Sequence, residues 1–257
     1  MISIRHLAPH LVQASATLIM KMRINKLLDT AQVPNNGGAL RFHQRGEEFA
    51  IEVVGIQGDL MSSALHDSED ALAELSLSKV KNSKEATVLI GGLGMGFTLA
   101  AALKHTGPNA KIVVAELVPE VVEWNKGPLG DRAGNPMNDP RSEVKVVDVL
   151  ELIRTSNGMY DVIMLDTDNG PVGLTQKSNN RLYSHRGLRS AYAALKPNGI
   201  LAVWSTDPDA PFTKRLGMAG FRVEELKVYA KGNKGTKHNL WFAKRGSEGV
   251  VADPSRK

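Results

Sequence analysis

Short runs of Val, Ile, Leu and Ala alternate with amphipathic segments between residues 86 and 206. Nearly continuous apolar runs are typical of strands that are buried on both faces of a sheet, whereas the segments between them have helical spacing. This alternation predicts a doubly wound, mostly parallel Rossmann-like α/β sheet. The expected strands are 87–91, 111–116, 143–148, 160–166 and 200–206, and the expected helices are 97–105, 118–126, 148–155 and 182–195.

The pattern changes at both ends of this α/β unit. After it, two apolar stretches flank the turn KGNKGTK, which predicts a C-terminal antiparallel hairpin at one edge of the sheet. Before it, short strands alternate with turn residues from residue 39 to 62, and a helix is expected over 66–77. We expect a leader and loop (1–38), a small N-terminal β appendage with one helix (39–83), a nucleoside-binding domain (84–246) and a basic tail (247–257).

Composition removes several classes of site. The chain has no Cys, which excludes disulfides, thiolate catalysis and cysteine-ligated metal clusters. The net charge of +5 is concentrated at the C-terminus, where residues 214–257 hold 11 basic and 4 acidic residues. Such a cluster can attract phosphate, but a solvated hairpin and tail explain it better, and the low aromatic content argues against base stacking. Nucleic acid is therefore not the expected partner.

A glycine-rich segment joins the first strand of the predicted sheet to its helix. Glycine has no side chain, so this turn lets the backbone approach a ligand and direct N–H groups toward it. Phe97 stands where a dinucleotide fingerprint has its third glycine, and no Gly-Lys-Ser/Thr follows as in a Walker A loop. The segment is a candidate ligand-binding turn, with a purely structural turn as the alternative. Its glycines are Gly91, Gly92, Gly94 and Gly96.

Acidic residues end the next two predicted strands. Glu116 follows the glycines at the distance from which an acid can accept both ribose hydroxyls of a nucleoside. Asp148 could receive an adenine amino group, with Val149 beside it. Each acid could instead cap the helix that follows it, so the binding and capping interpretations both stay open.

Asp166 and Asp168 follow the fourth predicted strand, at the mouth of the same crevice. Two nearby carboxylates can hold a cationic substrate, or one of them can serve as a base once its pKa is raised. Capping of the following turn is the alternative. From the N-terminal appendage, His66, Asp67 and Glu69 could form the opposite wall of the site, or could simply begin a solvated helix.

Together these segments resemble the spermidine synthase (polyamine aminopropyltransferase) family, a branch of the class I S-adenosylmethionine-dependent methyltransferase-like fold, over residues 40–245. VLIGGLGMG is similar to that family's VLIIGGGDGG, and YDVIMLDTDNGP to its YDVIIxDSSDPxGP. The resemblance implies that Glu116 binds ribose, that Asp148 and Val149 contact adenine, and that Asp166 is the catalytic base.

Two positions depart from the family pattern. The Asp of the family's glycine loop is Gly94 here, so a contact to the charged tail of the donor is missing. The second Asp of DSSD falls on Asn169, and Asp168, one position earlier, could compensate. The family's Tyr-His-Glu segment is represented only by residues 65–69. These departures put specificity for polyamines in question.

We expect a transferase that uses an S-adenosyl sulfonium donor. The resemblance implies aminopropyl transfer to a small-molecule amine acceptor in polyamine metabolism, with S-adenosylmethionine or its decarboxylated form as co-substrate and no metal. The alternatives are an S-adenosylmethionine-dependent methyltransferase and a nucleoside-binding protein that has lost catalysis; the missing third glycine disfavours a nicotinamide dehydrogenase. Because no stretch approaches the length of an apolar membrane span, we expect a cytoplasmic protein. A homodimer stays open, since this family often forms dimers.

Overall fold

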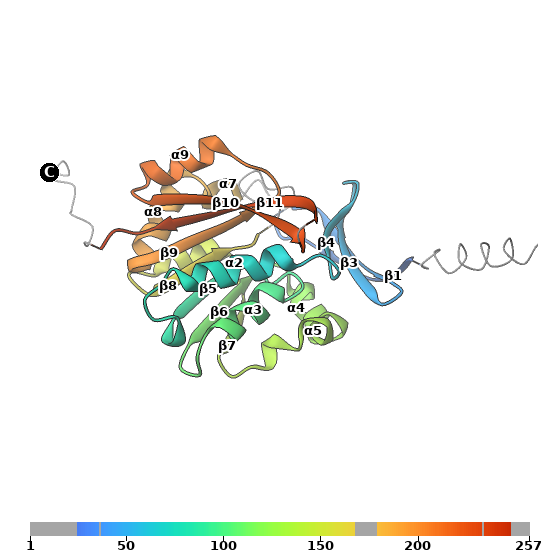
Figure 1. Ribbon diagram of the computed structural model, residues 1–257. Helices are drawn as coiled ribbons and strands as arrows, with labels where there is room; N and C mark the ends of the chain where they lie inside the picture. Colours follow the sequence, from blue (N-terminus) through green and yellow to red (C-terminus); the bar gives the residue numbers. More distant parts are fainter. Residues whose placement is uncertain (1–24, 36, 168–178, 233, 248–257) are drawn as a thin grey trace, which may run out of the picture.

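Two β-sheets form the frame of the molecule in the computed structural model, which describes residues 25–35, 37–167, 179–232 and 234–247 (Figure 1). The smaller sheet is antiparallel with strand order β1-β2-β3-β4. The larger sheet has the order β10-β11-β9-β8-β5-β6-β7, in which β5 to β9 are parallel and β10 and β11 form an antiparallel hairpin against β9. The predicted fold class is therefore confirmed.

The elements have the following bounds. The strands are β1 (Asn25–Gln32), β2 (Ala39–Arg45), β3 (Glu48–Val53), β4 (Asp59–Ser62), β5 (Thr87–Gly91), β6 (Lys111–Glu116), β7 (Ser142–Val146), β8 (Tyr160–Leu165), β9 (Leu195–Ser205), β10 (Arg222–Lys231) and β11 (Lys234–Lys244). The helices are α2 (Asp67–Ser78), α3 (Phe97–His105), α4 (Pro119–Asn125), α5 (Pro128–Ala133), α6 (Val149–Thr155), α7 (Asn179–Leu182), α8 (His185–Ala194) and α9 (Ala210–Met218), with single 3₁₀ turns at Ser83–Glu85 and Pro136–Asn138.

Strand β1 corrects the expectation that residues 1–38 are only a leader and a loop. The sequence did not predict this strand, because most of its residues are exposed and a bulge between Leu27 and Asp29 interrupts the alternation of its two faces. It is tied to the main domain through Asp29, whose carboxylate accepts a hydrogen bond from the Trp124 indole at 2.8 Å, while Phe42 of β2 stacks on the same indole. The expected domain boundaries themselves stay a prediction.

Three local predictions also need correction. The single helix expected over 182–195 is broken, because the Ser184 side chain accepts a hydrogen bond from the Gly187 N–H and begins α8 anew. Helix α9 was not predicted; its first turn is capped by Asp209, which accepts from the Phe212 N–H at 2.8 Å. The Pro-Asn-Gly turn at 197–199 lies within β9 as a break in register, with Asn198 at a φ of 65°.

Helices cover both faces of the larger sheet, as a doubly wound fold requires. One apolar cluster packs the sheet against α2, α3 and α4 and continues into the smaller sheet, whereas a second packs it against α6, α8 and α9. Helix α2 therefore covers the main sheet, although it was expected with the appendage (Figure 1). Within the described ranges, none of the helices has the length and apolar character needed to cross a membrane.

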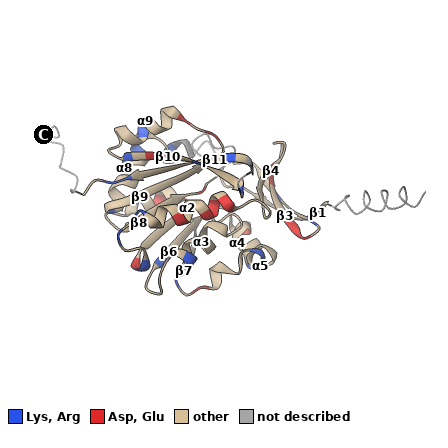
Figure 2. Cartoon of the chain, in the orientation of Figure 1, with Lys and Arg blue, Asp and Glu red and all other residues tan. Residues whose placement is uncertain are grey.

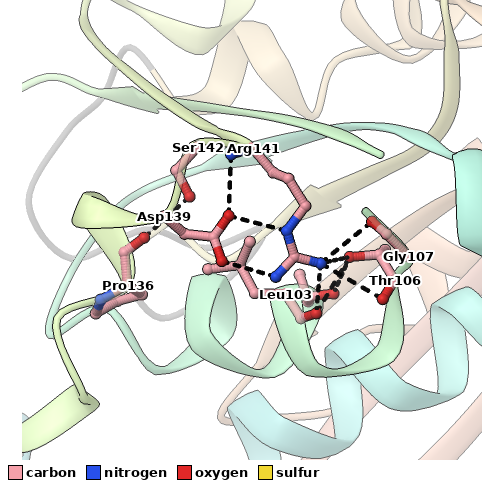
Figure 3. Close-up of polar contacts among 8 residues, drawn as sticks. Leu103, Thr106, Gly107, Pro136, Asp139, Arg141 and Ser142 are labelled. Atoms are coloured by element: carbon pink, nitrogen blue, oxygen red, sulfur yellow. Dashed lines mark hydrogen bonds and ion pairs between the residues drawn. The ribbon is translucent and has the colours of Figure 1, made fainter. Parts of the chain in front are cut away.

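An arginine holds the C-terminal end of α3 against the loop before β7 (Figure 3). The Arg141 guanidinium binds the Asp139 carboxylate through two hydrogen bonds of 2.7 and 2.9 Å. Its remaining nitrogen donates to the carbonyl oxygens of Leu103, Thr106 and Gly107 at 3.0–3.4 Å. This pairing lowers the pKa of Asp139 to about 2, with the Arg141 hydrogen bond as the main cause. The clamp satisfies carbonyl groups that the end of a helix leaves without partners.

Candidate active site

The glycine-rich turn requires its glycines for conformation and for space. Gly92 has a φ of 89°, and a Cβ there would lie 2.4 Å from the backbone oxygen of Asp166, so no other residue fits. Gly94 has a φ of 52°, and a Cβ there would approach the Met61 sulfur at 3.0 Å. The backbone of the turn therefore packs against the end of β8 at Gly92 and against the smaller sheet at Gly94. Either tight packing or the close approach of a ligand explains these glycines.

Glu116 joins this turn to the start of α4. One carboxylate oxygen accepts a hydrogen bond from the Leu93 N–H and the other from the Val118 N–H, both at 2.8 Å. Burial raises the pKa of Glu116, and these backbone N–H groups oppose the rise. The backbone N–H groups of Gly94 and Leu117 also favour the charged carboxylate. Glu116 does not cap α4, because the N-cap is Val118 and it has no side-chain capping bond, so the capping interpretation is wrong for this residue. Ribose binding stays a prediction.

Asp148 caps helix α6, since its side chain accepts a hydrogen bond from the Leu150 N–H at 2.8 Å. The capping interpretation is therefore confirmed for Asp148. Asp148 and the buried Val149 also line a cavity together with Gly92, Gly94 and Glu116. The predicted adenine contact remains compatible with this position, because capping uses one of the two carboxylate oxygens.

This first cavity opens to solvent, and the space inside it and at its mouth is about 780 Å³. Its floor is the carboxyl end of the parallel strands, where open α/β sheets bind ligands. Its other wall comes from the smaller sheet and was not anticipated from the sequence. The residues of that wall are Val33, Leu40, Ile51, Leu60 and Met61.

Asp166 follows β8 and lines both this cavity and a second one. Its carboxylate accepts a hydrogen bond from the Thr98 hydroxyl at 2.6 Å. Burial raises the pKa of Asp166 to about 6, although the Thr98 hydrogen bond lowers it. A carboxyl group that titrates near neutral pH in a cavity is suited to accept a proton.

Glu69 of α2 lies in the second cavity with Asp166. Burial, and secondarily the charge of Asp166, raise the pKa of Glu69 to about 8. Glu69 is one of three acidic residues in the first turn of α2 (Figure 2). The two acids therefore form a pair that holds a proton around neutral pH, because two close carboxylates resist ionising together.

The second cavity has a volume of about 1060 Å³, open to solvent, and mixes polar with apolar walls. It adjoins the first cavity, because Leu60, Met61, Gly94 and Asp166 line both. Several of its residues were missed in the sequence because they lie far from the glycine turn along the chain, on β9, β11 and the segment between. They include Trp204, Thr206 and His238.

His66 and Asp67 do not line either cavity. Asp168 lies outside the described residues. The His66 ring stacks on Phe97 and pairs with Asp70 at 3.1 Å, and the Asp67 carboxylate accepts the Gly232 N–H. The polar groups of His66, Asp67 and Asp70 lie within 4.8 Å of one another, but because each already has a protein partner we assign them no metal.

Comparison with known proteins places these features in context. The family model of the spermine/spermidine synthase domain matches residues 66–214. A polyamine aminopropyltransferase of Prochlorococcus marinus (strain AS9601) is 30% identical over 166 residues, which is 63% of this chain and 56% of that protein. That of Bacillus subtilis (strain 168) is 29% identical over 189 residues, or 73% of this chain and 64% of that protein. The chain thus spans less than two thirds of the length of these curated relatives.

Solved structures share the fold. Spermidine synthase from Thermotoga maritima superposes with a TM-score of 0.70 at 19% identity. The superposition covers 87% of this chain and 74% of the Thermotoga chain. A spermidine synthase in complex with the transition-state analogue AdoDATO gives 0.68 at 18% identity, covering 87% and 73%. At this level of identity the likeness concerns the arrangement of the elements.

Proposed function

This chain belongs to the spermine/spermidine synthase domain family, and we propose that it transfers an aminopropyl group from decarboxylated S-adenosylmethionine to a small amine in polyamine metabolism. The observation that carries the proposal is the position of Asp166, a carboxyl group with a raised pKa that lines two adjoining cavities. A two-substrate transfer needs such a junction, because the nucleophile and the reacting carbon must meet.

The first cavity is the proposed donor site. Glu116 would accept the ribose hydroxyls, and Asp148 would accept the adenine amino group, with Val149 against the ring. The apolar wall from the smaller sheet would cover the nucleoside and exclude water. These contacts bind substrate and transition state alike, so they act on affinity more than on turnover.

The second cavity is the proposed acceptor site. Its acids, Glu69 and Asp166, attract an amine-bearing substrate, and its apolar residues suit an alkyl chain. The amine lone pair attacks the carbon next to the sulfonium; as the C–N bond forms, the C–S bond breaks and its electron pair stays on sulfur. Asp166 takes the proton that the amine must lose. Alignment of the two substrates can contribute up to roughly 7–11 kcal/mol, and base catalysis about 10²–10⁴-fold in rate.

Methyl transfer from ordinary S-adenosylmethionine is the second candidate. The observation that favours it is Gly94, which has no side chain to repel a carboxylate on the donor tail and lies against Met61 rather than beside an acid. The cytoplasmic location remains a prediction from the sequence, which has no stretch as long as an apolar membrane span, and a homodimeric assembly remains a prediction from the family resemblance.

The test is a product assay with purified protein. Incubation with decarboxylated S-adenosylmethionine and 1,4-diaminobutane should release methylthioadenosine, whereas ordinary S-adenosylmethionine should yield little S-adenosylhomocysteine with any amine acceptor. The reverse product pattern would favour the methyltransferase. Calorimetry with methylthioadenosine tests the donor site separately, and failure to bind either donor or this product would contradict the nucleoside assignment.

Glu116→Ala is the matched variant for the donor site and should weaken nucleoside binding by about 1–3 kcal/mol. Glu116→Gln is not a mild substitution at this position. Because both carboxylate oxygens accept backbone N–H groups, one of those donors would face the amide nitrogen of Gln. Circular dichroism must therefore accompany the calorimetry, and unchanged affinity in a folded Glu116→Ala variant would leave Glu116 a structural residue only.

A further inference from the structure

A chain of hydrogen bonds leads out of the second cavity from Glu69. The buried Ser68 hydroxyl lies 2.5 Å from the Glu69 carboxylate and 2.9 Å from Nδ1 of His238. Ser68 and Glu69 begin α2, whereas His238 lies on β11, so the chain spans two elements that are 170 residues apart in sequence. Ser68 thus connects a carboxyl group to an imidazole through one rotatable hydroxyl, which can donate one hydrogen bond and accept others.

His238 has the protonation state that such a chain needs. The half-buried ring is packed edge-on against Trp204 at 4.5 Å between ring centres, and Val228 is its register partner on β10. Burial lowers the pKa of His238, and the charge of Asp207, from the segment after β9, opposes the fall. Glu69 is the other titratable group on this side of the His238 ring, and the Ser68 hydroxyl lies between the two. The imidazole is therefore neutral near pH 7 and has one nitrogen free to accept a proton.

The proposed reaction releases a proton beside Asp166 and Glu69, which both line the second cavity. Each transfer turns a primary amine into a secondary ammonium, whose proton passes to the carboxyl pair. Asp166 already accepts a hydrogen bond from Thr98, and its charge favours a proton on Glu69. For the pair to accept the proton of the next cycle, the first one must leave. Glu69 is the member of the pair whose hydrogen-bonded neighbour, Ser68, contacts an imidazole that can take up a proton.

We propose that Ser68 and His238 carry this proton from Glu69 to solvent; the inference deepens the proposed aminopropyl transfer and depends on it for its effect on turnover. Glu69 gives its proton to the Ser68 oxygen while the Ser68 hydroxyl gives its own to Nδ1 of His238. The resulting imidazolium releases the Nε2 proton to water. One proton leaves, Glu69 becomes a carboxylate, and the exchange of ring protons with water restores the first tautomer. Both residues act through Glu69 and are positioning residues for the reaction.

This path makes the His238 tautomer depend on Glu69. While Glu69 is protonated, it donates to Ser68, Ser68 donates to Nδ1, and the ring keeps its proton on Nε2. Once Glu69 ionises, Ser68 donates to the carboxylate and accepts from Nδ1, so the ring proton moves to Nδ1. The pKa of Glu69, raised to about 8, sets the midpoint of this change.

The first test needs no turnover. Nitrogen-15 shifts of the His238 ring in the full chain should change from the Nε2–H to the Nδ1–H pattern between about pH 6.5 and 9.5, with a midpoint near the Glu69 pKa of about 8. The change should vanish in Ser68→Ala and in Glu69→Gln, whose side chain cannot ionise. A tautomer that stays the same across this range in the unmodified protein would overturn the proton path, whatever the protein catalyses.

The second test measures turnover with decarboxylated S-adenosylmethionine and 1,4-diaminobutane. His238→Asn keeps a donor near the position of Nδ1 but cannot take up a proton, so kcat should fall about tenfold with little change in KM, and added imidazole should restore it. His105→Asn, at the far end of α3, is the matched control and should leave kcat unchanged. Unchanged kcat in His238→Asn beside an active parent would overturn the role in turnover. An inactive parent would instead count against the proposed function, and the tautomer measurement alone would then decide on the path.

Discussion

The two ends of helix α3 hold carboxyl groups in opposite electrostatic environments. At the C-terminal end, Asp139 binds the Arg141 guanidinium, and this pairing lowers the pKa of Asp139 to about 2 (Figure 3). At the N-terminal end, Asp166 accepts a hydrogen bond from the uncharged Thr98 hydroxyl, and burial raises its pKa to about 6. Glu69 beside it reaches a pKa of about 8.

The difference separates stability from chemistry. A guanidinium fixes its partner as a carboxylate over the whole physiological range, so Asp139 can hold structure but cannot exchange protons. A carboxyl group that lacks such a partner stabilises the fold less, yet it can take up and release protons near neutral pH. The same helix thus has a permanent ion pair at one end and a titrating pair at the other, and the predictions below test that division.

The largest effect is expected at Asp166. Asp166→Asn keeps the shape of the side chain and removes its basicity, so turnover should fall at least about 10²-fold with little change in donor affinity. Steady-state kinetics and calorimetry with methylthioadenosine measure the two quantities. Asp139→Asn is the control and should keep turnover. An active Asp166→Asn together with an inactive Asp168→Asn would show that the neighbouring acid is the base.

Glu69 should destabilise the folded protein as pH rises. Its pKa is about 8 in the folded state against 4.5 for the free side chain, so between these values the unfolded chain loses a proton that the folded chain keeps. Stability from this group is complete below pH 4.5 and falls as pH rises toward about 8. Glu69→Gln should remove this slope and be more stable at pH 8 by about 4 kcal/mol. Thermal unfolding across this range measures it, and parallel curves for the two proteins would contradict the burial of Glu69.

Asp139 should show the opposite slope. Its folded pKa of about 2 lies below the free value of 3.8, so its stabilisation is present above pH 3.8 and is lost as pH falls through about 2. The side chain is 26% exposed, and solvent screening reduces the effect. We expect Asp139→Asn to cost about 1.5 kcal/mol at pH 7 in chemical denaturation. A variant as stable as the parent would mean that Arg141 holds the α3 carbonyl groups without help.

The sequence predicted the main sheet far better than the site. Parallel strands such as 111–116 are marked by local apolar runs, and the structure reproduces them. The glycine turn and Glu116 could also be found, since their spacing reflects one strand–turn–helix unit. Strand β1 could not, because its residues are mostly exposed and a bulge breaks its pattern.

The second cavity could not be predicted from the sequence, for a different reason. His238 and Glu69 meet only through packing of α2 on the C-terminal hairpin, and no local pattern encodes that contact. The acids at the start of α2 are equally typical of a solvated first turn. Asp67 and Asp70 are indeed partly exposed to solvent. Glu69 differs in that its surroundings raise its pKa to about 8, and those surroundings exist only in the folded molecule.

The smallest effect is expected on the affinity for the donor tail, at Gly94 just before the N-terminal end of α3. Gly94 leaves its position without the acid of the family pattern, so a tail carboxylate meets no repulsion there, and we expect ordinary and decarboxylated S-adenosylmethionine to bind within about 1.4 kcal/mol, or tenfold, of each other. Gly94→Asp should favour the decarboxylated form. The φ of 52° is one that Asp tolerates, but its Cβ would lie 3.0 Å from the Met61 sulfur, so Gly94→Asp with Met61→Ala is the fairer variant and Met61→Ala alone its control. Competition against methylthioadenosine measures both affinities. A hundredfold preference of the unmodified protein for the decarboxylated donor would show that another group reads the tail.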